Sequence, residues 1–299
     1  MVSLCVFAPL REIFLTNTQT RVDTTASLTQ STTRAEARPD RLWRITAIAR
    51  NAFREAVRDR VLYNLVLFVL LLTAASIFIG ELSGGQERKV IVDLGLSAML
   101  LFGVFIAIFV GVGLVYKEIE RRTIYAVFSK PVGRGEFLVG KYLGLCLTLL
   151  VNVLVMAVGV SLALLYVSGG WDPLIPTIWP AVLLIYIELM LLTAVALLFS
   201  SFSSPALSAL LTFFVFVIGH FSADLKALAG SMGSTSARWL FTGLYYLLPN
   251  LANYSFITPA AHGRAPAAGF VLAAALYALV YITVILAAAT MVFSRRNFK

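Results

Sequence analysis

The sequence has few charged residues and few side chains suited to metal binding or redox chemistry. Lys, Arg, Asp and Glu together make up 13% of its 299 residues, against about a quarter in an ordinary soluble domain. Its two cysteines, Cys5 and Cys146, lie in unrelated segments without a CxxC or Cys/His spacing. They give no basis for a disulfide framework or a zinc site. We therefore expect no metal site and no redox cofactor.

Apolar residues are abundant instead, at 60% of the chain. They fall into runs of roughly 18 to 25 positions, the length that an α-helix needs to cross about 30 Å of hydrocarbon. The surplus of apolar surface must then face lipid. The sequence predicts an all-α, polytopic membrane protein with six transmembrane helices, at about 61–80, 93–116, 142–167, 178–200, 205–221 and 267–293.

The first 60 residues precede these runs. The stretch VSLCVFAPL is short, has no basic residue before it and lacks a small-residue cleavage site, so no signal peptide is predicted. Residues 1–40 are rich in Thr and Ser and are expected to form a disordered tail. Residues 41–60 place apolar and arginine side chains on opposite helical arcs, which predicts an amphipathic elbow helix in the membrane interface. Residues 61–299 then form the transmembrane domain.

The net charge of +9 is better explained by topology than by nucleic-acid binding. With an even number of spans, both termini and the loop 117–141 share one side, and that side holds nineteen of the 24 Lys and Arg residues. The positive-inside bias places it in the cytoplasm. We expect a multi-pass protein of the plasma (inner) membrane with cytoplasmic N- and C-termini and an external segment at 222–266. The expected surroundings are a lipid bilayer, with no nucleic acid.

Two short strings imitate nucleotide-binding motifs. Residues 82–86 spell LSGGQ, but in a loop between two spans on the non-cytoplasmic side. Residues 135–141, GEFLVGK, fit GxxxxGK, but Tyr142 replaces the Ser or Thr that holds magnesium, Glu136 adds negative charge, and no β-strand precedes the glycines. The sequence therefore predicts no ATPase site and no enzyme activity in this chain.

The loop 117–141 is the most informative segment. The second span is expected to continue as a helix into water, until Pro131 and two glycines break it and a new helix begins near Glu136. The resulting hairpin presents charges beside Tyr125 and Phe128, which suits docking to another protein. An alternative is a basic loop that only fixes the topology.

Over nearly the whole chain after residue 40, the sequence resembles the ABC-2 type permeases, in particular the six-span class that includes permeases for maturation of nitrous oxide reductase. Their loop has the form E-x-R-T-I-Y…S-K-P-[IV]-x-R-x-E-F-x-x-G-K, and Val127 and Phe128 stand where leucines are more usual. YYLLPN, ending at Pro249 and Asn250, resembles their external segment. The loop matches are Glu120, Arg122, Thr123, Ile124, Tyr125, Ser129, Lys130, Pro131, Val132, Arg134, Glu136, Phe137, Gly140 and Lys141.

This resemblance implies a permease subunit, operating in export, whose loop 117–141 sits in a groove of a separate ATPase subunit. It implies a homodimer of permeases with two ATPases, which bind ATP and magnesium, and no cofactor or catalytic residue in this chain. The residues expected to couple to the ATPase are Glu118, Glu120, Arg121, Arg122, Thr123, Tyr125, Phe128, Pro131 and Arg134.

Polar residues within the spans are the other candidates for function. Glu188 lies in the middle of the fourth span, where an ionised side chain costs about 2.5–3.5 kcal/mol, and Asn152 of the third span is a candidate partner. They indicate either a substrate path or dimer contact, or an ordinary interhelical hydrogen bond. His220 and Asp224, four residues apart, are expected to form a boundary pair.

Two rival functions remain at this point. A proton-coupled secondary transporter would use Glu188 and His220 as a relay, although it predicts internal repeats that the sequence does not show. An intramembrane hydrolase would need HExxH or a Ser/His arrangement, and the spans contain neither.

Overall fold

The computed structural model describes residues 41–295 except 59, 82–83, 121–132, 223–226, 228–229 and 231–234. Within these residues every regular element is helical, with no strand. Four of the described helices are long and apolar enough to cross a membrane, and they provide the spans Glu87–Gly113, Gly135–Ser168, Leu174–Ser200 and Ala268–Phe293. The expected all-α, polytopic membrane architecture is therefore confirmed.

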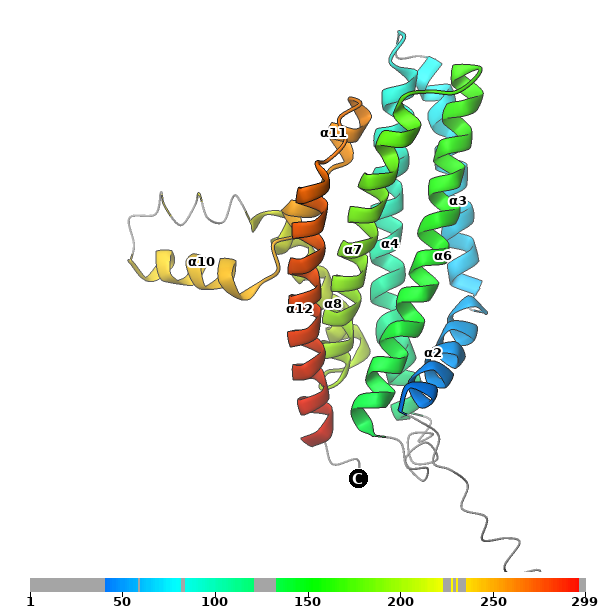
Figure 1. Cartoon of the computed structure of the whole chain (residues 1–299). Helices are drawn as coiled ribbons and strands as arrows, with labels where there is room; N and C mark the ends of the chain where they lie inside the picture. Colours follow the sequence, from blue (N-terminus) through cyan, green and yellow to red (C-terminus); the bar gives the residue numbers. More distant parts are fainter. Residues whose placement is uncertain are drawn as a thin grey trace, which may run out of the picture. The chain divides into compact units, whose positions relative to one another are not determined.

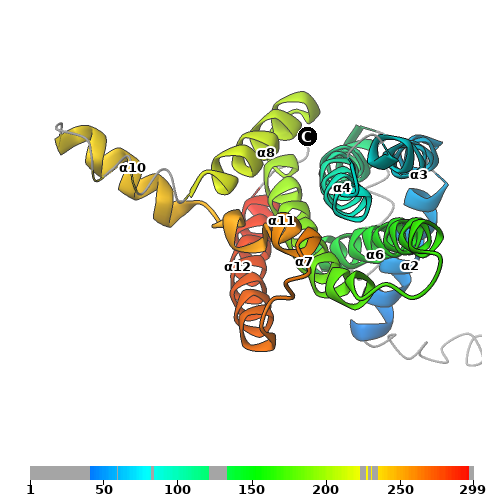
Figure 2. The same ribbon diagram turned by 90° about the horizontal axis from the view of Figure 1, so that it is seen from above.

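The four long helices form an elongated bundle (Figure 1). They are α4 (Glu87–Glu120), α6 (Arg134–Ser168), α7 (Leu174–Ser200) and α12 (Ala268–Arg295). α7 contacts α4, α6 and α12, and most of its side chains are buried, so it forms the centre of the core. α3 (Arg60–Glu81) packs against α4 and α6 at the edge of the bundle (Figure 2).

The exposed faces of the long helices are apolar. On α12, the side chains of Leu272, Leu279, Val280 and Val284 are each more than half exposed. A helix that is apolar on its outer face as well as its inner face is typical of a membrane span, because lipid replaces water around it. Packing in a protein core would explain the apolar side chains on the inner face of such a helix but not those on its outer face.

Two further apolar helices are shorter. α8 (Pro205–His220) has 16 residues, which rise about 24 Å, less than the roughly 30 Å of a hydrocarbon core. It begins with Pro205 in its first turn, where a missing N–H costs nothing, and it contacts α7 and α4. α3 has an apolar stretch at Val69–Gly80. A count of six complete spans thus stays a prediction.

The elbow segment forms α2 (Arg41–Val57), which lies against the first part of α6. The two helices approach closely at Gly140 and Gly144. A Cβ atom added at Gly140 would lie 2.7 Å from Ile48 Cβ, and one at Gly144 would lie 2.6 Å from the Ala49 carbonyl oxygen. This spacing of two small residues allows helix backbones to come together.

The segment between α8 and α12 contains shorter helices. α10 (Thr235–Leu247) projects away from the bundle in both views (Figures 1 and 2). The chain then returns through the 3₁₀ helix η1 (Leu251–Tyr254), which contacts α7 and α8, and α11 (Ile257–Ala261), which contacts α4 and α7.

Candidate functional site

The ends of α4 and α6 bracket the segment expected to bind a partner. α4 continues without interruption to Glu120, and α6 begins at Arg134 after the N-cap residue Gly133. The glutamate at the third position, Glu136, accepts a hydrogen bond from the Gly133 N–H at 3.3 Å, as in a capping box. Both helix ends thus agree with the expected continuation of the second span and the new start near Glu136.

The expected coupling residues divide between the two parts of this region. Glu118 and Glu120 belong to the last turn of α4, and Arg134 is the first residue of α6. The other six lie outside the described residues: Arg121, Arg122, Thr123, Tyr125, Phe128 and Pro131.

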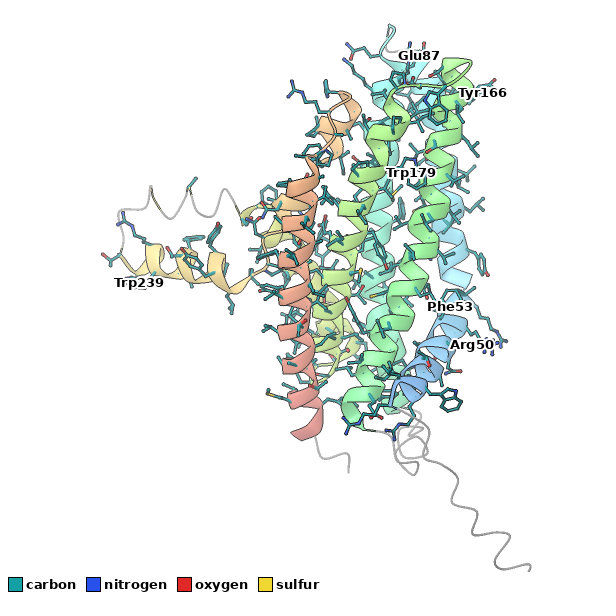
Figure 3. The ribbon with its side chains drawn as sticks, in the orientation of Figure 1. Arg50, Phe53, Glu87, Tyr166, Trp179 and Trp239 are labelled. Atoms are coloured by element: carbon teal, nitrogen blue, oxygen red, sulfur yellow. The ribbon has the colours of Figure 1, made fainter. Side chains whose placement is uncertain are left out.

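Ion pairs fasten the start of α6 to α2. Lys141 Nζ lies 3.3 Å from Glu55 Oε2, and the lysine side chain is 1% exposed. Arg44 donates a hydrogen bond to Glu136 Oε1 at 3.1 Å. Arg50 and Phe53 lie on α2 at the same end of the bundle (Figure 3). The helix that follows the loop 117–141 is therefore attached to a second helix by two ion pairs.

Of the two nucleotide-binding look-alikes, GEFLVGK has a structure that does not suit phosphate binding. GEFLVGK lies within α6, so its amide groups take part in a helix instead of forming a loop around phosphates, and its lysine is paired with Glu55. In LSGGQ, Gly84 and Gly85 have φ values of +61° and +92°, in the turn before α4. The string leads directly into α4, but it joins two apolar helices of the bundle, α3 and α4, whereas the ATPase motif functions inside a folded nucleotide-binding domain.

The opposite end of the bundle has an ion pair between α4 and the α6–α7 turn. Arg88 Nη1 lies 3.3 Å from Asp172 Oδ2, and the same carboxylate accepts hydrogen bonds from the Ser168 hydroxyl and the Leu174 N–H. Burial by itself raises the pKa of Asp172, but these two hydrogen bonds and the Arg88 guanidinium outweigh it and lower that pKa below its ordinary value.

Glu188 lies in the centre of the bundle. It is the fifteenth of the 27 residues of α7, and its side chain is completely buried. His220, the last residue of α8, places its Nδ1 atom 3.5 Å from Glu188 Oε1. Within the described part of the chain, neither carboxylate oxygen accepts a hydrogen bond, and His220 Nδ1 makes none.

The structure thus brings Glu188 together with His220 instead of with Asn152. The Asn152 amide donates to the Thr148 carbonyl on its own helix at 2.7 Å. Asp224, the expected partner of His220, lies outside the described residues. Sequence spacing could not reveal the Glu188–His220 contact, because it depends on how α8 packs against α7.

An open cavity of about 330 Å³ is lined in part by His220, and Glu188 is not among its lining residues. Its other lining residues come from α4, from the end of α8 with the residue that follows, and from the start of α11. They are Ser97, Leu100, Leu101, Phe216, Val217, Phe221 and Ile257. The wall is apolar apart from the Ser97 hydroxyl and the His220 ring.

Hydrogen bonds fix the chain beyond His220 to the segment YYLLPN. The Ser222 hydroxyl donates to Asn250 Oδ1 at 2.6 Å, and the Asn250 N–H donates to the Tyr277 hydroxyl of α12 at 3.1 Å. Gly219 also allows a close approach, since an added Cβ would lie 2.9 Å from the Pro249 carbonyl oxygen. These contacts therefore join the expected external segment to the end of α8 and to α12.

A bundle of long apolar helices with a buried carboxylate at its centre defines this chain as a polytopic membrane protein. It belongs to the ABC-2 family of transporters: the model of that family, described as ABC-2 family transporter protein, matches residues 46–298. The chain is also 29% identical, over 248 residues, to a protein of Pseudomonas aeruginosa described as probable ABC transporter permease protein NosY. The match covers 75% of this chain and 86% of that protein. The resemblance inferred from the loop is thereby confirmed, and the chain is an ABC transporter permease.

Proposed function

We propose that this permease is driven by a separate ABC ATPase subunit that docks on the loop 117–141. Membership of the ABC-2 family carries the proposal. The two strings in this sequence that imitate nucleotide-binding motifs also support the proposal, because neither has the surroundings that the motif needs. ATP would then be hydrolysed by another subunit. The chain itself acts as a transporter subunit and not as an enzyme, and neither ATP nor magnesium binds to it.

The bundle is suited to transmit a movement of that loop. α4 and α6 extend from the loop through the whole bundle as uninterrupted helices of 34 and 35 residues. The start of α6 is held by Lys141–Glu55 and Arg44–Glu136, so a push on the loop displaces α2 and α6 together. Nucleotide-driven closure of two ATPases against two permeases would thus tilt the helices between two states.

The position of α2 supports the interfacial helix that the sequence predicts. Leu42 and Trp43 are 77% and 63% exposed, and Arg50, Arg54 and Arg58 are exposed in the same segment. Arginines beside exposed apolar side chains at one end of a membrane bundle suit the headgroup region of anionic lipid. Together with the excess of Lys and Arg, this supports a cytoplasmic location for the loop 117–141 and the two termini, in a protein of the inner membrane. Export is the expected direction of transport.

Co-purification tests the ATPase partner. The full-length permease is co-expressed with a soluble ABC ATPase encoded in a neighbouring reading frame. Reversing two charges of the loop, Arg121→Glu with Arg122→Glu, should lower the amount of bound ATPase by about tenfold, a change of roughly 1.4 kcal/mol. The matched control is Lys89→Glu with Arg264→Glu, at the other end of the bundle, which should retain it. Equal retention by both variants would contradict the proposal.

The Glu188–His220 contact is the observation that favours a second candidate, a proton-coupled transporter. Family membership makes ATP the expected energy source. Transport by permease and ATPase in lipid vesicles separates the two: an imposed pH gradient should drive no uptake without ATP, whereas uptake driven by the gradient alone would support the second candidate.

A further inference from the structure

Glu188 is a buried carboxylate that lacks adequate partners. Its side chain is completely buried, and within the described residues neither oxygen accepts a hydrogen bond. The ion-pair contact that the structure gives it is with His220, at 3.5 Å, and this contact lacks hydrogen-bond geometry. Burying an ionised carboxylate with so little compensation is costly, so either a bound proton or a nearby positive charge must compensate it.

The Lys and Arg residues that the structure pairs with carboxylates lie at the two ends of the bundle. Arg44 is paired with Glu136, Lys141 with Glu55 and Arg88 with Asp172. In the described part of the chain no ion pair joins a lysine or arginine to Glu188. A cation that compensates this carboxylate would therefore come from outside these residues.

The cavity beside His220 has the chemistry for an organic cation. Its wall includes the aromatic rings of Phe216 and Phe221, several aliphatic side chains and the hydroxyl group of Ser97. Aromatic faces attract organic cations, whereas a hydrated inorganic cation needs several oxygen ligands. The described residues contain no group of three potential metal ligands. The volume of the cavity, about 330 Å³, lies at the lower end of the range for small-molecule sites.

We infer that the cavity between α4, α8 and α11 binds a lipophilic organic cation, with Glu188 behind His220 as its counter-charge. The apolar wall holds the body of the ligand and the buried carboxylate selects the sign of its charge. His220 is the positioning residue, since it lies between the cavity and Glu188. Transport of such a cation through this site would rest on the proposed function. Binding of the cation does not, because it needs the permease alone.

The test uses tetraphenylphosphonium and tetraphenylborate, two ions of similar shape and opposite charge. Their binding to the full-length permease in lipid nanodiscs is measured by equilibrium dialysis, with binding to empty nanodiscs subtracted. The permease should bind the cation more tightly than the anion. Glu188→Gln keeps the shape of the side chain and should weaken binding of the cation by about tenfold or more, without weakening binding of the anion.

Two further variants locate the site. Leu101→Trp fills part of the cavity without changing a charge, and it should weaken binding of the cation as well. Asp93→Asn removes a different carboxylate, on α4, which accepts a hydrogen bond from Thr258 on the exposed surface. This variant should leave binding unchanged. If Glu188→Gln does not fold, Leu101→Trp and the comparison of the two ions still decide the question.

The inference is overturned if the permease does not discriminate between the two ions, or if Glu188→Gln or Leu101→Trp binds tetraphenylphosphonium as the unmodified protein does. The co-purification experiment does not depend on this result. Loss of the ATPase partner with cation binding intact would contradict the proposed function alone, and the reverse outcome would contradict the cation site alone.

Discussion

At the scale of single residues, Lys141 shows how a charged side chain is stabilised inside the bundle. Its ammonium group lies 3.3 Å from Glu55, which is 38% exposed, while the lysine is 1% exposed. Lys141→Met keeps the apolar stem of the side chain but removes the charge. Because the pair is intermediate between exposed and buried, we expect the free energy of unfolding to fall by about 1–2 kcal/mol, measured as a lower midpoint of thermal unfolding in detergent.

A double-mutant cycle separates the ion pair from other effects of this substitution. Glu55→Gln combined with Lys141→Met should cost less than the sum of the two single changes, because the second removes a partner that is already lost. Additive costs would show that the pair contributes nothing. Neither the unmodified protein nor the Lys141→Met variant should bind ATP, because GEFLVGK, which ends at Lys141, is part of a helix.

Asp172 gives the opposite end of the bundle a dependence on acid pH. Hydrogen bonds from Ser168 and Leu174 and the Arg88 guanidinium lower its pKa despite burial, which acts in the other direction. A carboxyl group whose pKa is lower in the folded state adds stability above its unfolded pKa of about 3.9, and this stability is lost as the pH falls through the lower, folded value. The turn between α6 and α7 should therefore be weakened by strong acid.

The corresponding variant is Asp172→Asn. Its midpoint of thermal unfolding should lie below that of the unmodified protein by a constant amount from pH 7 to pH 5, and this difference should shrink as the pH falls below about 4. A difference that remains unchanged down to pH 3 would contradict this role of the charge.

At the scale of elements, the contact between α2 and α6 depends on the small residues Gly140 and Gly144. Gly144→Leu would place a side chain where even a Cβ lies 2.6 Å from Ala49 O and Ala52 Cβ. We expect α2 to separate from α6, at a cost of about 1–3 kcal/mol. Spin labels on α2 and α6 should report a longer and broader distance distribution. Gly113→Leu is the matched control, because a Cβ there meets no atom within 4 Å.

The sequence predicted the helices of this bundle better than their contacts. Apolar runs gave the four long spans, and Pro131 with its neighbouring glycines gave the start of α6, since these signals are local. Glu188 and His220 were named together only as the relay of a rival transporter, and Asn152 was the expected partner of Glu188. The direct contact could not be derived, because the two residues lie on different helices whose packing is not encoded in hydropathy. The hydrogen bond between Ser222 and Asn250 joins residues 28 apart and was missed for the same reason.

At the scale of the whole molecule, the two ends of the bundle have different charge arrangements. The end with α2 holds Arg44–Glu136 and Lys141–Glu55, and the other end holds Arg88–Asp172. The added Cβ of Gly263 would lie 3.4 Å from Leu174, so the start of α7 and the turn after α11 share this second end. The excess of Lys and Arg in the segments expected at the first end predicts that this end faces the cytoplasm.

Cysteine labelling in sealed, right-side-out vesicles tests that orientation. Single cysteines at positions 130, 84 and 264 are introduced after replacement of Cys5 and Cys146, and a membrane-impermeant maleimide is added. Positions 84 and 264 should react from outside, and position 130 should react only after the membrane is permeabilised. Labelling of position 130 from outside would contradict the cytoplasmic loop and, with it, the docking of an ATPase there. Labelling of position 264 only after permeabilisation would leave the cytoplasmic loop unaffected. It would show instead that the chain between α7 and α12 does not cross the membrane as the six-span count requires. This outcome is physically reasonable because α8 alone is too short to span the hydrocarbon.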